Sequence, residues 1–391
     1  MKVAINGCGI AGPTFAWWLR HYGHEPVLIE RADNLRSGGY LIDFWGTGYD
    51  VAEDMGLLPA LKDHAYHMER LRTVTAREWT TSSIDVSVFN KITGGRYFSI
   101  ARSDLSAAIF RACDGIETRF GTEVSGIEDR GDRVDVFLSD GTSEPFDIVV
   151  GADGLHSKVR NVVFGQQAQF EHHLGFYVAA FTLDGYQPRD ELAVVSHTVP
   201  GRYLSRVSLR DDRTLFLMVV ADNYLRSDLQ DSRSIRQELR RIFRDTGWES
   251  NAIVARIDEP DDLYFDRASQ IRMSHWYKGR TALVGDAAAG PSLLAGEGTS
   301  LAMTEARVLA GELARSGGNI AAAFHAYEGE LKSFLLKKQD AALRFADYFA
   351  PKSWIGLIAR DVMSNVASVP LLAKWMLAGV FRDNLELPDY H

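Results

Sequence analysis

The glycine-rich segment near the N-terminus limits the fold of this chain more than any other feature. A strand-like run from Lys2 to Asn6 leads into residues 7–12, GCGIAG, and a helix-like stretch and a second strand-like run follow, the latter ending at Glu30. In such a pattern the first glycine permits a tight turn, the second lets a pyrophosphate approach the backbone, and the third allows close packing of helix on strand. The acidic residue that ends the second strand can bind a ribose. The segment therefore predicts a βαβ unit that binds a dinucleotide, either NAD or FAD.

Two later segments repeat the order of strand, tight turn and helix. The first is residues 147–160, DIVVGADGLHSKVR, in which a helix is expected to begin near Ser157. By itself it could be an ordinary strand-to-helix connection. In the second, Gly285-Asp286 follows a buried strand, and a glycine loop at residues 296–300 then opens a long helix. An aspartate there can bind sugar-alcohol hydroxyls, and the helix N-terminus presents positive potential to an anion.

Composition and charge exclude several classes of protein. The 391 residues include 43 Lys and Arg against 52 Asp and Glu, a formal net charge of −9, and no run of basic residues occurs, so a nucleic acid is not an expected partner. The two cysteines, Cys8 and Cys113, belong to no pair or cluster with metal-ligand spacing, which predicts neither a metal site nor a disulfide framework. This cysteine usage favours a reducing compartment, and we expect a cytoplasmic protein.

Targeting and membrane segments are not expected. The strand-like run that begins at Val3 leaves no room for the charged and apolar regions of a secretory signal. The most apolar stretch, residues 354–381, is interrupted by Arg360, Asp361, Pro370 and Lys374, so no membrane span is predicted. Two terminal helices that pack on the body are favoured over a peripheral membrane contact.

The middle of the chain predicts a second domain. From about Gly175 to Val220, alternating segments separated by turn residues indicate a mostly antiparallel sheet. The strand at residues 281–284 returns the chain to the first domain, and the chain is mainly helical from Thr299 onward. Since no Pro- or Ser-rich linker occurs, we expect an α/β fold in which a Rossmann-type domain is interleaved with this sheet domain, with helices at the C-terminus.

Three motifs in this order resemble those of the group A FAD-dependent monooxygenases, the flavoproteins of the p-hydroxybenzoate hydroxylase type. The glycine segment with Glu30 resembles the ADP site of that family, residues 149–160 its DG motif and residues 283–288 its GD motif. Residues 38–43, GGYLID, are most similar to the flavin-side loop of tetracycline-inactivating and antibiotic-pathway members. The resemblance covers nearly the whole chain.

The resemblance implies a division of the chain and a cofactor, FAD. Residues 1–70, 97–170 and 270–345 would form a discontinuous FAD-binding domain, residues 71–96 and 171–269 the substrate-binding domain, and residues 346–391 the C-terminal helices. No second unit of strand, GxGxxG and helix occurs. NADPH or NADH would therefore visit as a transient co-substrate without a Rossmann domain of its own.

The resemblance also implies roles for individual residues. Glu30 would hold the adenosine ribose, Arg102 the pyrophosphate or ribityl chain, and Asp286 the ribityl hydroxyls. The helix that begins near Gly298 would point its N-terminus at the flavin N1 and C2 carbonyl. No catalytic side chain is expected, because the chemistry takes place at the flavin C4a atom. The expected FAD-binding residues are Gly7, Gly9, Ile10, Ala11, Gly12, Glu30, Arg31, Gly39, Asp43, Arg102, Leu105, Val124, Asp153, Asp286, Gly296, Gly298 and Thr299.

The expected substrate pocket lies between the Gly175–Val220 sheet and the flavin. Four apolar residues are candidates for its wall, with membership of the ordinary core as the alternative for each: Phe176, Phe181, Leu204 and Met218. The adjacent His172 and His173 point to opposite faces of a strand, which favours a structural role over a metal or acid/base pair.

In the family, NAD(P)H reduces FAD, O2 adds at C4a, and the resulting hydroperoxide transfers one oxygen atom to an electron-rich carbon. The resemblance thus implies a monomer or homodimer that hydroxylates an aromatic or polycyclic small molecule, of the kind found in secondary metabolism. Two family positions differ here, because Ala289 stands where histidine is common and Leu293 where proline is common. These differences leave the shape of the flavin-side loop open. They do not change the expectation that the protein binds FAD.

Three other functions are compatible with the same scaffold in general. A flavin-dependent halogenase is disfavoured, because its Trp-x-Trp signature is missing: no two tryptophans lie two positions apart. A non-oxygenating flavin dehydrogenase or reductase shares the same motifs. A flavoprotein that binds its substrate without turnover also shares them, because inactive members can keep the cofactor motifs. The last two alternatives stay open at the level of sequence.

Overall fold

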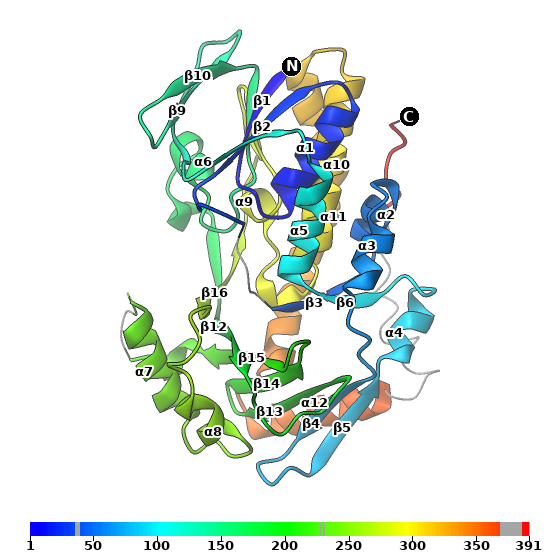
Figure 1. Ribbon diagram of the computed structural model, residues 1–391, viewed down its shortest axis with the longest axis vertical. Coiled ribbons are helices and arrows are strands. Elements are labelled where there is room, and N and C mark those ends of the chain that lie inside the picture. The colour runs from blue at the N-terminus through cyan, green and yellow to red at the C-terminus, as the bar shows by residue number, and fades with distance from the viewer. Residues whose placement is uncertain (36–39, 227–228, 230, 368–384, 391) are drawn as a thin grey trace.

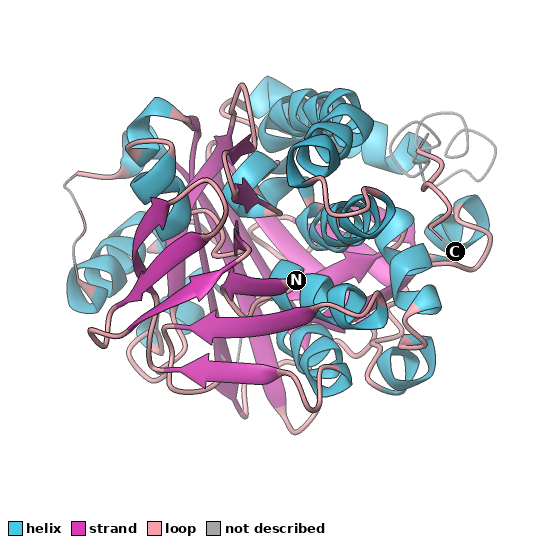
Figure 2. Ribbon diagram, turned by 90° about the horizontal axis from the view of Figure 1, so that it is seen from above, coloured by secondary structure: helices cyan, strands magenta, loops and turns pink. Residues whose placement is uncertain are grey.

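The computed structural model describes residues 1–35, 40–226, 229, 231–367 and 385–390. A parallel sheet with its helices occupies the upper part of Figure 1, and a larger, mostly antiparallel sheet occupies the lower part. Seen from above, the strands lie at the centre with helices on both sides (Figure 2). The expected α/β fold with a Rossmann-type domain is confirmed.

The parallel sheet is built around the N-terminal strand. Within the described residues it has six strands in the order β17-β18-β11-β1-β2-β7, and β1 pairs in parallel with both β11 and β2. The chain that leaves β1 returns to the sheet at β2 on one side, and the chain that leaves β11 returns at β18 on the other side. The carboxyl ends of β1 and β11 therefore mark a switch point, where ligands bind in such sheets. The strands are β1 (Lys2–Asn6), β2 (Glu25–Glu30), β7 (Glu117–Phe120), β11 (Ile148–Gly151), β17 (Tyr277–Lys278) and β18 (Thr281–Leu283).

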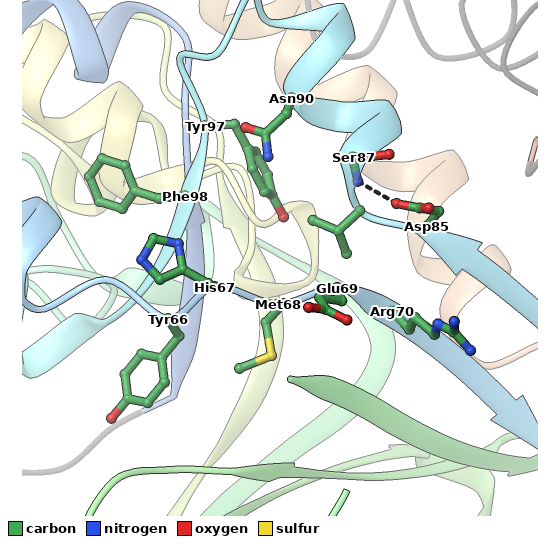
Figure 3. A pocket seen from close by; sticks show the side chains of 11 residues that line it. Tyr66, His67, Met68, Glu69, Arg70, Asp85, Ser87, Asn90, Tyr97 and Phe98 are labelled. Atoms are coloured by element: carbon green, nitrogen blue, oxygen red, sulfur yellow. Dashed lines mark hydrogen bonds between the residues drawn. The ribbon is translucent and has the colours of Figure 1, made fainter. Parts of the chain in front are cut away.

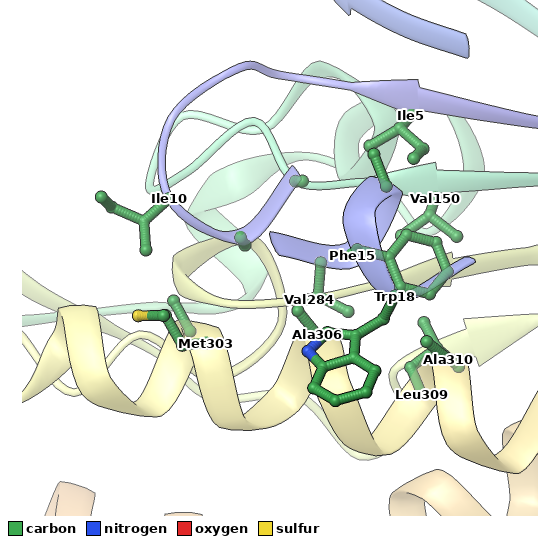
Figure 4. Packing of buried hydrophobic residues seen from close by; sticks show 14 of the residues in the cluster. Ile5, Ile10, Phe15, Trp18, Val150, Val284, Met303, Ala306, Leu309 and Ala310 are labelled. Carbon is green, nitrogen blue, oxygen red and sulfur yellow. The ribbon is translucent and has the colours of Figure 1, made fainter. Parts of the chain in front are cut away.

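Two helices cover one side of this sheet because their apolar residues match its buried strands. Helix α1 (Ala11–His21) lies against α10 (Gly298–Arg315), and Phe15, Trp18 and Met303 are at most 2% exposed. Figure 4 shows Phe15 beside Val150 of β11, Trp18 beside helix α10, and Met303 on that helix. Strands β1 and β11 are continuous runs of buried apolar residues, as is usual for central parallel strands.

The larger sheet has seven strands among the described residues, in the order β16-β12-β15-β14-β13-β4-β5. Neighbouring strands are antiparallel except for β13 and β4, which confirms a mostly antiparallel sheet. Helices α7 (Ser232–Phe243) and α8 (Ser250–Ala255) pack on one face, and the other face is turned toward the parallel sheet. The strands are β4 (Arg70–Val74), β5 (Thr80–Asp85), β12 (Glu171–Asp184), β13 (Ala193–Val199), β14 (Arg202–Ser208), β15 (Arg213–Ala221) and β16 (Tyr264–Ile271).

A two-stranded sheet lies between these two layers. Strands β3 (Leu41–Phe44) and β6 (Phe98–Ala101) are antiparallel, with Asp43 opposite Ser99. Their residues alternate between the two layers: Ile42, Phe44, Phe98 and Ile100 belong to the core of the parallel sheet. Leu41, on the other face, packs in a cluster with Val194 and Val207 of the seven-stranded sheet. This small sheet therefore separates the two larger ones.

The remaining elements connect and cover these sheets. They are β8 (Val124–Asp129), β9 (Val134–Leu138), β10 (Ser143–Phe146), α2 (Thr47–Asp54), α3 (Leu58–Asp63), α4 (Ser87–Ile92), α5 (Arg102–Ala112), α6 (Lys158–Val163), α9 (Asp286–Ala289), α11 (Ile320–Phe349), α12 (Trp354–Ala367) and the 3-10 turns η1 (Gln167–Gln169), η2 (Asp222–Tyr224) and η3 (Leu293–Ala295). Ser157 caps α6 by accepting a hydrogen bond from the Arg160 amide, as its sequence predicts.

Helix α12 packs on the body through one of its sides, and the described residues 385–390 pack against the core of the parallel sheet, where Tyr390 donates a hydrogen bond to Glu312 of α10. Arg360 donates a hydrogen bond to Thr198 of β13 at 2.9 Å, while Ile355 and Ile358 on the same helix are 82% and 65% exposed. The second helix expected within residues 354–381 falls mostly on residues 368–384, outside the described part of the chain. No helix among the described residues has the length and apolarity needed to cross a membrane.

Candidate active site

Three glycines of the first loop take the positions that a pyrophosphate-binding turn needs. A methyl group on Gly7 would come within 2.5 Å of the Ala152 carbonyl oxygen, and one on Gly12 within 1.9 Å of the Gly7 carbonyl oxygen. Gly7 also has a φ of 112°, which other residues rarely adopt. At Gly9 the nearest atom to such a methyl group is Arg102 Nη2, at 3.8 Å. Gly7 and Gly12 are therefore required for packing, whereas Gly9 leaves its side of the loop open to a ligand.

Glu30 holds this loop from the end of β2. Its Oε2 accepts a hydrogen bond from the Cys8 amide at 2.8 Å, and its Oε1 accepts one from the Ala32 amide at 3.0 Å. At the N-terminus of α1, the N-cap residue Ile10 offers no side-chain acceptor to the first turn of the helix. The positive end of α1 and the Glu30 carboxylate thus lie at the same edge of the sheet, an arrangement that suits a phosphate beside a ribose.

Asp153 organises the second loop. Its carboxylate accepts hydrogen bonds from Asn6 Nδ2, Ser157 Oγ and the backbone amides of Lys158 and Val159, at 2.6–3.1 Å. Asn6 in turn accepts a hydrogen bond from the Val124 amide. These bonds give Asp153 a structural role at the carboxyl ends of β1 and β11. Its expected contact with FAD stays a prediction.

Arg160 connects the second loop to the third. This fully buried side chain donates from Nη1 to the Ala287 carbonyl oxygen at 3.0 Å and from Nη2 to the Leu155 carbonyl oxygen at 2.6 Å. Burial lowers the pKa of the guanidinium, and the nearby Asp153 and Asp286 oppose that change. Arg160 is part of the second motif, but the sequence predicted no role for it. Because its side chain is buried, it connects the two loops by hydrogen bonds. The pattern of apolar residues along the sequence does not reveal this burial.

Asp286 differs from the other carboxylates of the site. It is exposed to solvent, yet desolvation raises its pKa, against the opposing effect of Arg102 and Arg160. None of the hydrogen bonds among the described residues ends on its carboxylate, and a methyl group on Gly298 would lie 3.6 Å from its Oδ1. The N-cap position of α10, Glu297, provides no side-chain cap. Asp286 is therefore an acceptor that no described residue bonds, at the N-terminus of a long helix, where a ligand can reach it.

The same combination of solvent contact and desolvation recurs between the two sheets. Burial is the largest cause of a raised pKa at five side chains that nevertheless retain exposed surface: Tyr40, Asp43, Tyr203, Tyr264 and Asp286. The rings of Tyr40 and Tyr264 lie 6.3 Å apart, and Arg102 affects the pKa of both. We call the region between the two sheets that contains these five residues the interdomain space.

The other expected FAD-binding residues lie around these loops. Leu105 is fully buried on α5, Ala11 is the first residue of α1, and Gly298 and Thr299 are the first two residues of α10. Gly296 adopts a left-handed conformation, with a φ of 71°, just before α10. Arg31 directly follows β2 and is exposed, while Gly39 lies outside the described residues. Tyr40 lies in the expected flavin-side loop, residues 38–43, whereas Tyr203 and Tyr264 were not predicted, because no motif identifies a tyrosine that lines a space between domains.

The expected substrate wall needs a correction. Phe176 packs with Leu294 of η3, on the face of the seven-stranded sheet that is turned toward the parallel sheet. Phe181, Leu204 and Met218 instead pack on the opposite face, in a cluster with residues of α7 and α8. These three are core residues, the alternative that the sequence left open. Alternation shows which residues share a face but not which face meets a ligand.

A surface pocket of about 340 Å³ lies beside strand β6 of the two-stranded sheet, away from the glycine loops. It is lined by residues from the segments 66–70, 85–90 and 97–98. Figure 3 shows Tyr97 and Phe98 on one side of it, with Asn90 above and Met68, Glu69 and Arg70 below. The Tyr97 hydroxyl donates a hydrogen bond to Asp43 at 2.7 Å. Tyr97 therefore lies between this pocket and Asp43. No group of His, Cys, Asp and Glu side chains in the described part of the chain could hold a metal ion.

Comparison with known proteins identifies relatives along the whole chain. A protein family described as "FAD binding domain" matches residues 1–330. A flavin-dependent monooxygenase of Legionella longbeachae is 31% identical over 376 residues, which cover 93% of this chain and 94% of the relative. The crystal structure of the tetracycline destructase Tet(55) is 30% identical, with a TM-score of 0.85, and the alignment covers 100% of this chain and 98% of that one. The complex of Klebsiella pneumoniae HpxO with FAD and uric acid, at 21% identity and a TM-score of 0.81, shares the fold.

Proposed function

This chain belongs to the FAD-binding, flavin-dependent monooxygenases, and from that premise we propose that it hydroxylates an aromatic or polycyclic small molecule with NAD(P)H and O2. The observation that carries the proposal is Asp286, a desolvated carboxylate without a hydrogen-bond partner among the described residues, open to solvent at the N-terminus of α10. Such a carboxylate suits the hydroxyls of a ribityl chain, and the helix end suits the anionic form of a reduced flavin.

The described residues fit FAD in both halves of the site. Gly9 and the uncapped N-terminus of α1 would hold the pyrophosphate, Glu30 the adenosine ribose, Arg102 the pyrophosphate or ribityl chain, and Asp286 the ribityl hydroxyls. Bound FAD would supply the redox and oxygen chemistry, through the C4a-hydroperoxide that the family resemblance implies. The protein would bind, orient and exclude water.

The substrate would lie in the interdomain space, between the flavin and the inner face of the seven-stranded sheet. Two features support an aromatic or polycyclic compound. Tyr40, Tyr203 and Tyr264 offer ring faces with polar ends. Relatives with this fold are named for tetracycline or were solved with uric acid, and both are ring compounds with several oxygen atoms.

Reduction of the bound flavin by NADPH or NADH tests this function. Purified protein should retain FAD, oxidise NADPH or NADH slowly alone, and oxidise it much faster when its substrate is present, because an uncoupled reduced flavin would waste O2 as peroxide. A library of phenolic and polycyclic compounds, screened by loss of NAD(P)H absorbance at saturating FAD, should yield such a stimulator. A folded protein that ignores FAD would contradict the proposal, and rapid reduction with stoichiometric product under strict anaerobiosis would indicate a dehydrogenase.

We also propose the remaining features expected from the sequence. The FAD-binding domain would comprise residues 1–70, 97–170 and 270–345, and the substrate-binding domain residues 71–96 and 171–269, which fits the presence of β4 and β5 in the seven-stranded sheet. A cytoplasmic location is supported by two buried, free cysteines. A monomer or homodimer is proposed on the family resemblance alone.

A further inference from the structure

Glu305 of α10 is a buried carboxylate that has no part in the function proposed above. Its side chain is 2% exposed, and its Oε2 accepts a hydrogen bond from the Gly285 amide at 2.8 Å. The next residue of that loop is Asp286, which is open to solvent. Two carboxylates are therefore attached to one loop, Glu305 on its buried side and Asp286 on the side where FAD would bind.

The hydrogen bonds around Tyr327 indicate that Glu305 carries a proton. The buried Tyr327 Oη lies 3.1 Å from the Leu283 carbonyl oxygen and 3.2 Å from Glu305 Oε2. A tyrosine hydroxyl has one hydrogen, so the two oxygens compete for it if Glu305 is ionised. A proton on Glu305 supplies a second hydrogen to this group. Both contacts can then be hydrogen bonds at the same time.

The charges around the loop act differently on its two carboxylates. Burial raises the pKa of Glu305 to about 8 against the effect of its hydrogen bonds, and the like charge of Asp286 adds to the rise. Arg102 and Arg160 act on Asp286 instead, where they oppose the rise in pKa that burial causes. The positive groups of the site thus favour an ionised Asp286, whereas the surroundings of Glu305 favour its neutral form.

The other elements packed on α10 bring no free charge to Glu305. On α11, Glu328 is paired with Lys332 at 2.9 Å, and on α2, Asp54 is paired with Arg307 at 2.6 Å. The buried side chains of α1 do not titrate. Among these groups, the charge that acts on Glu305 is that of Asp286.

We propose that Glu305 is a positioning residue whose proton is coupled to the cofactor: FAD binds best while Glu305 is neutral, and bound FAD makes Glu305 hold its proton more tightly. This inference rests on the role proposed for Asp286 toward the ribityl chain. FAD is an anion, and hydroxyls that donate to Asp286 favour its ionised form. Both effects increase the negative charge beside Glu305, so an ionised Glu305 opposes them.

Such coupling acts in both directions. Below pH 8 Glu305 is neutral with and without FAD, so the affinity should not depend on its titration. Above pH 8 the free protein has lost this proton, and FAD binding must bring it back from the solvent, with formation of an O–H bond and no transfer of electrons. FAD affinity should therefore fall above pH 8, by up to about 10-fold per pH unit.

Proton uptake on FAD binding tests the coupling without substrate or turnover. FAD is added to the apo protein at pH 8.5 in weakly buffered solution, and a pH indicator reports the protons taken up. Wild type should take up a large fraction of one proton for each FAD bound, and Glu305→Gln should take up almost none. Glu312→Gln changes another buried carboxylate of α10, which is paired with Arg315, and should behave as wild type.

Retention of FAD at different pH values gives a second measurement on the loaded protein. In equilibrium dialysis, the dissociation constant of wild type should rise several-fold between pH 8 and pH 9, and that of Glu305→Gln should change little. Tyr327→Phe serves if Glu305→Gln does not fold. The hydrogen bond from Tyr327 lowers the pKa of Glu305, so its loss should move the onset of the rise to higher pH.

Three results would overturn the proposal. They are wild type that takes up no proton with FAD at pH 8.5, uptake by Glu305→Gln equal to that of wild type, and the same onset of FAD loss in Tyr327→Phe and wild type. Failure of the proposed function is separate. Proton uptake without substrate-stimulated use of NAD(P)H would refute only the hydroxylation, and hydroxylation without proton uptake would refute only the role of Glu305.

Discussion

At the scale of single residues, the three acidic residues at the carboxyl ends of strands of the parallel sheet differ in what they already bind. Asp153 accepts four hydrogen bonds from the protein, and Glu30 accepts two from backbone amides. Asp286 accepts none from the described residues and remains open to solvent. A motif treats all three alike, because it records the residue type and not the donors around it. Asp286 is thus the carboxylate best placed to bind a ligand.

Replacing Asp286 by Asn should separate stability from cofactor binding. The apo protein should melt at a higher temperature at neutral pH, because the ionised carboxylate is desolvated and Asn removes that charge. FAD affinity should fall on the order of 10-fold, as expected for the loss of a hydrogen bond from a charged acceptor. Calorimetry of the apo protein and flavin fluorescence titration measure the two effects. Tighter FAD binding by Asp286→Asn would refute the assigned role.

The glycines of the first loop allow a matched pair of substitutions. Gly12→Ala should destabilise the apo protein strongly, since the new methyl group would meet the Gly7 carbonyl oxygen at 1.9 Å. Gly9→Ala should leave the apo free energy of unfolding within about 1 kcal/mol, because the methyl group has room, but should weaken FAD binding by about 10-fold or more. Urea unfolding and FAD titration distinguish them. Equal FAD affinity for wild type and Gly9→Ala would show that the pyrophosphate does not bind at this loop.

At the scale of elements, helix α10 fixes the third loop through a buried polar group. Glu305 accepts a hydrogen bond from the Gly285 amide at 2.8 Å and one from Tyr327 Oη at 3.2 Å. A methyl group on Gly285 would lie 3.3 Å from the Cβ atoms of Ala11 and Ala302, so this loop is held between the first turns of α1 and α10. The two helix N-termini therefore converge on the same region, which is where an anionic ligand would be stabilised.

The stability of the apo protein should depend on pH through Glu305. Burial raises the pKa of Glu305 to about 8, so the folded protein keeps a proton that the unfolded chain releases near 4.5. Stability should fall as pH rises between these values, by up to about 1.4 kcal/mol per pH unit, and level off above pH 8. Glu305→Gln should flatten this slope. The free energy of unfolding of both proteins can be measured with denaturant from pH 5 to 9. If it depends on pH in the same way for wild type and Glu305→Gln, Glu305 is ionised in the folded protein.

Elements were more predictable from the sequence than their faces. The strands that precede the three loops, and the helix capped by Ser157, follow from short apolar runs with glycine or serine at their ends. Phe181, Leu204 and Met218 were offered as substrate walls but pack under α7 and α8. Both faces of their strands are apolar, so local pattern cannot show which one meets the parallel sheet. That depends on where distant helices pack.

At the scale of the whole molecule, the site exists only where two sheets meet. Residues from β3, β14, β16 and the loop after β18 line the interdomain space, and in sequence they are separated by more than 200 positions. The family resemblance predicted the cofactor half of this site, because loops and helix ends carry recognisable motifs. It did not predict Tyr203, Tyr264 or the bond between Tyr97 and Asp43, since these contacts depend on how the sheets pack. In the proposed function, substrate recognition would belong to this second half.

Isotope labelling tests the central claim most directly, namely that the two sheets enclose a flavin and a substrate for hydroxylation. Purified enzyme is allowed to turn over with NAD(P)H and its stimulating substrate under ¹⁸O2. The mass of the product is then measured by mass spectrometry. The account predicts one ¹⁸O atom in each product molecule, with the second atom in water. Product without the label, or oxidation of the substrate that proceeds equally well without O2, would contradict a monooxygenase.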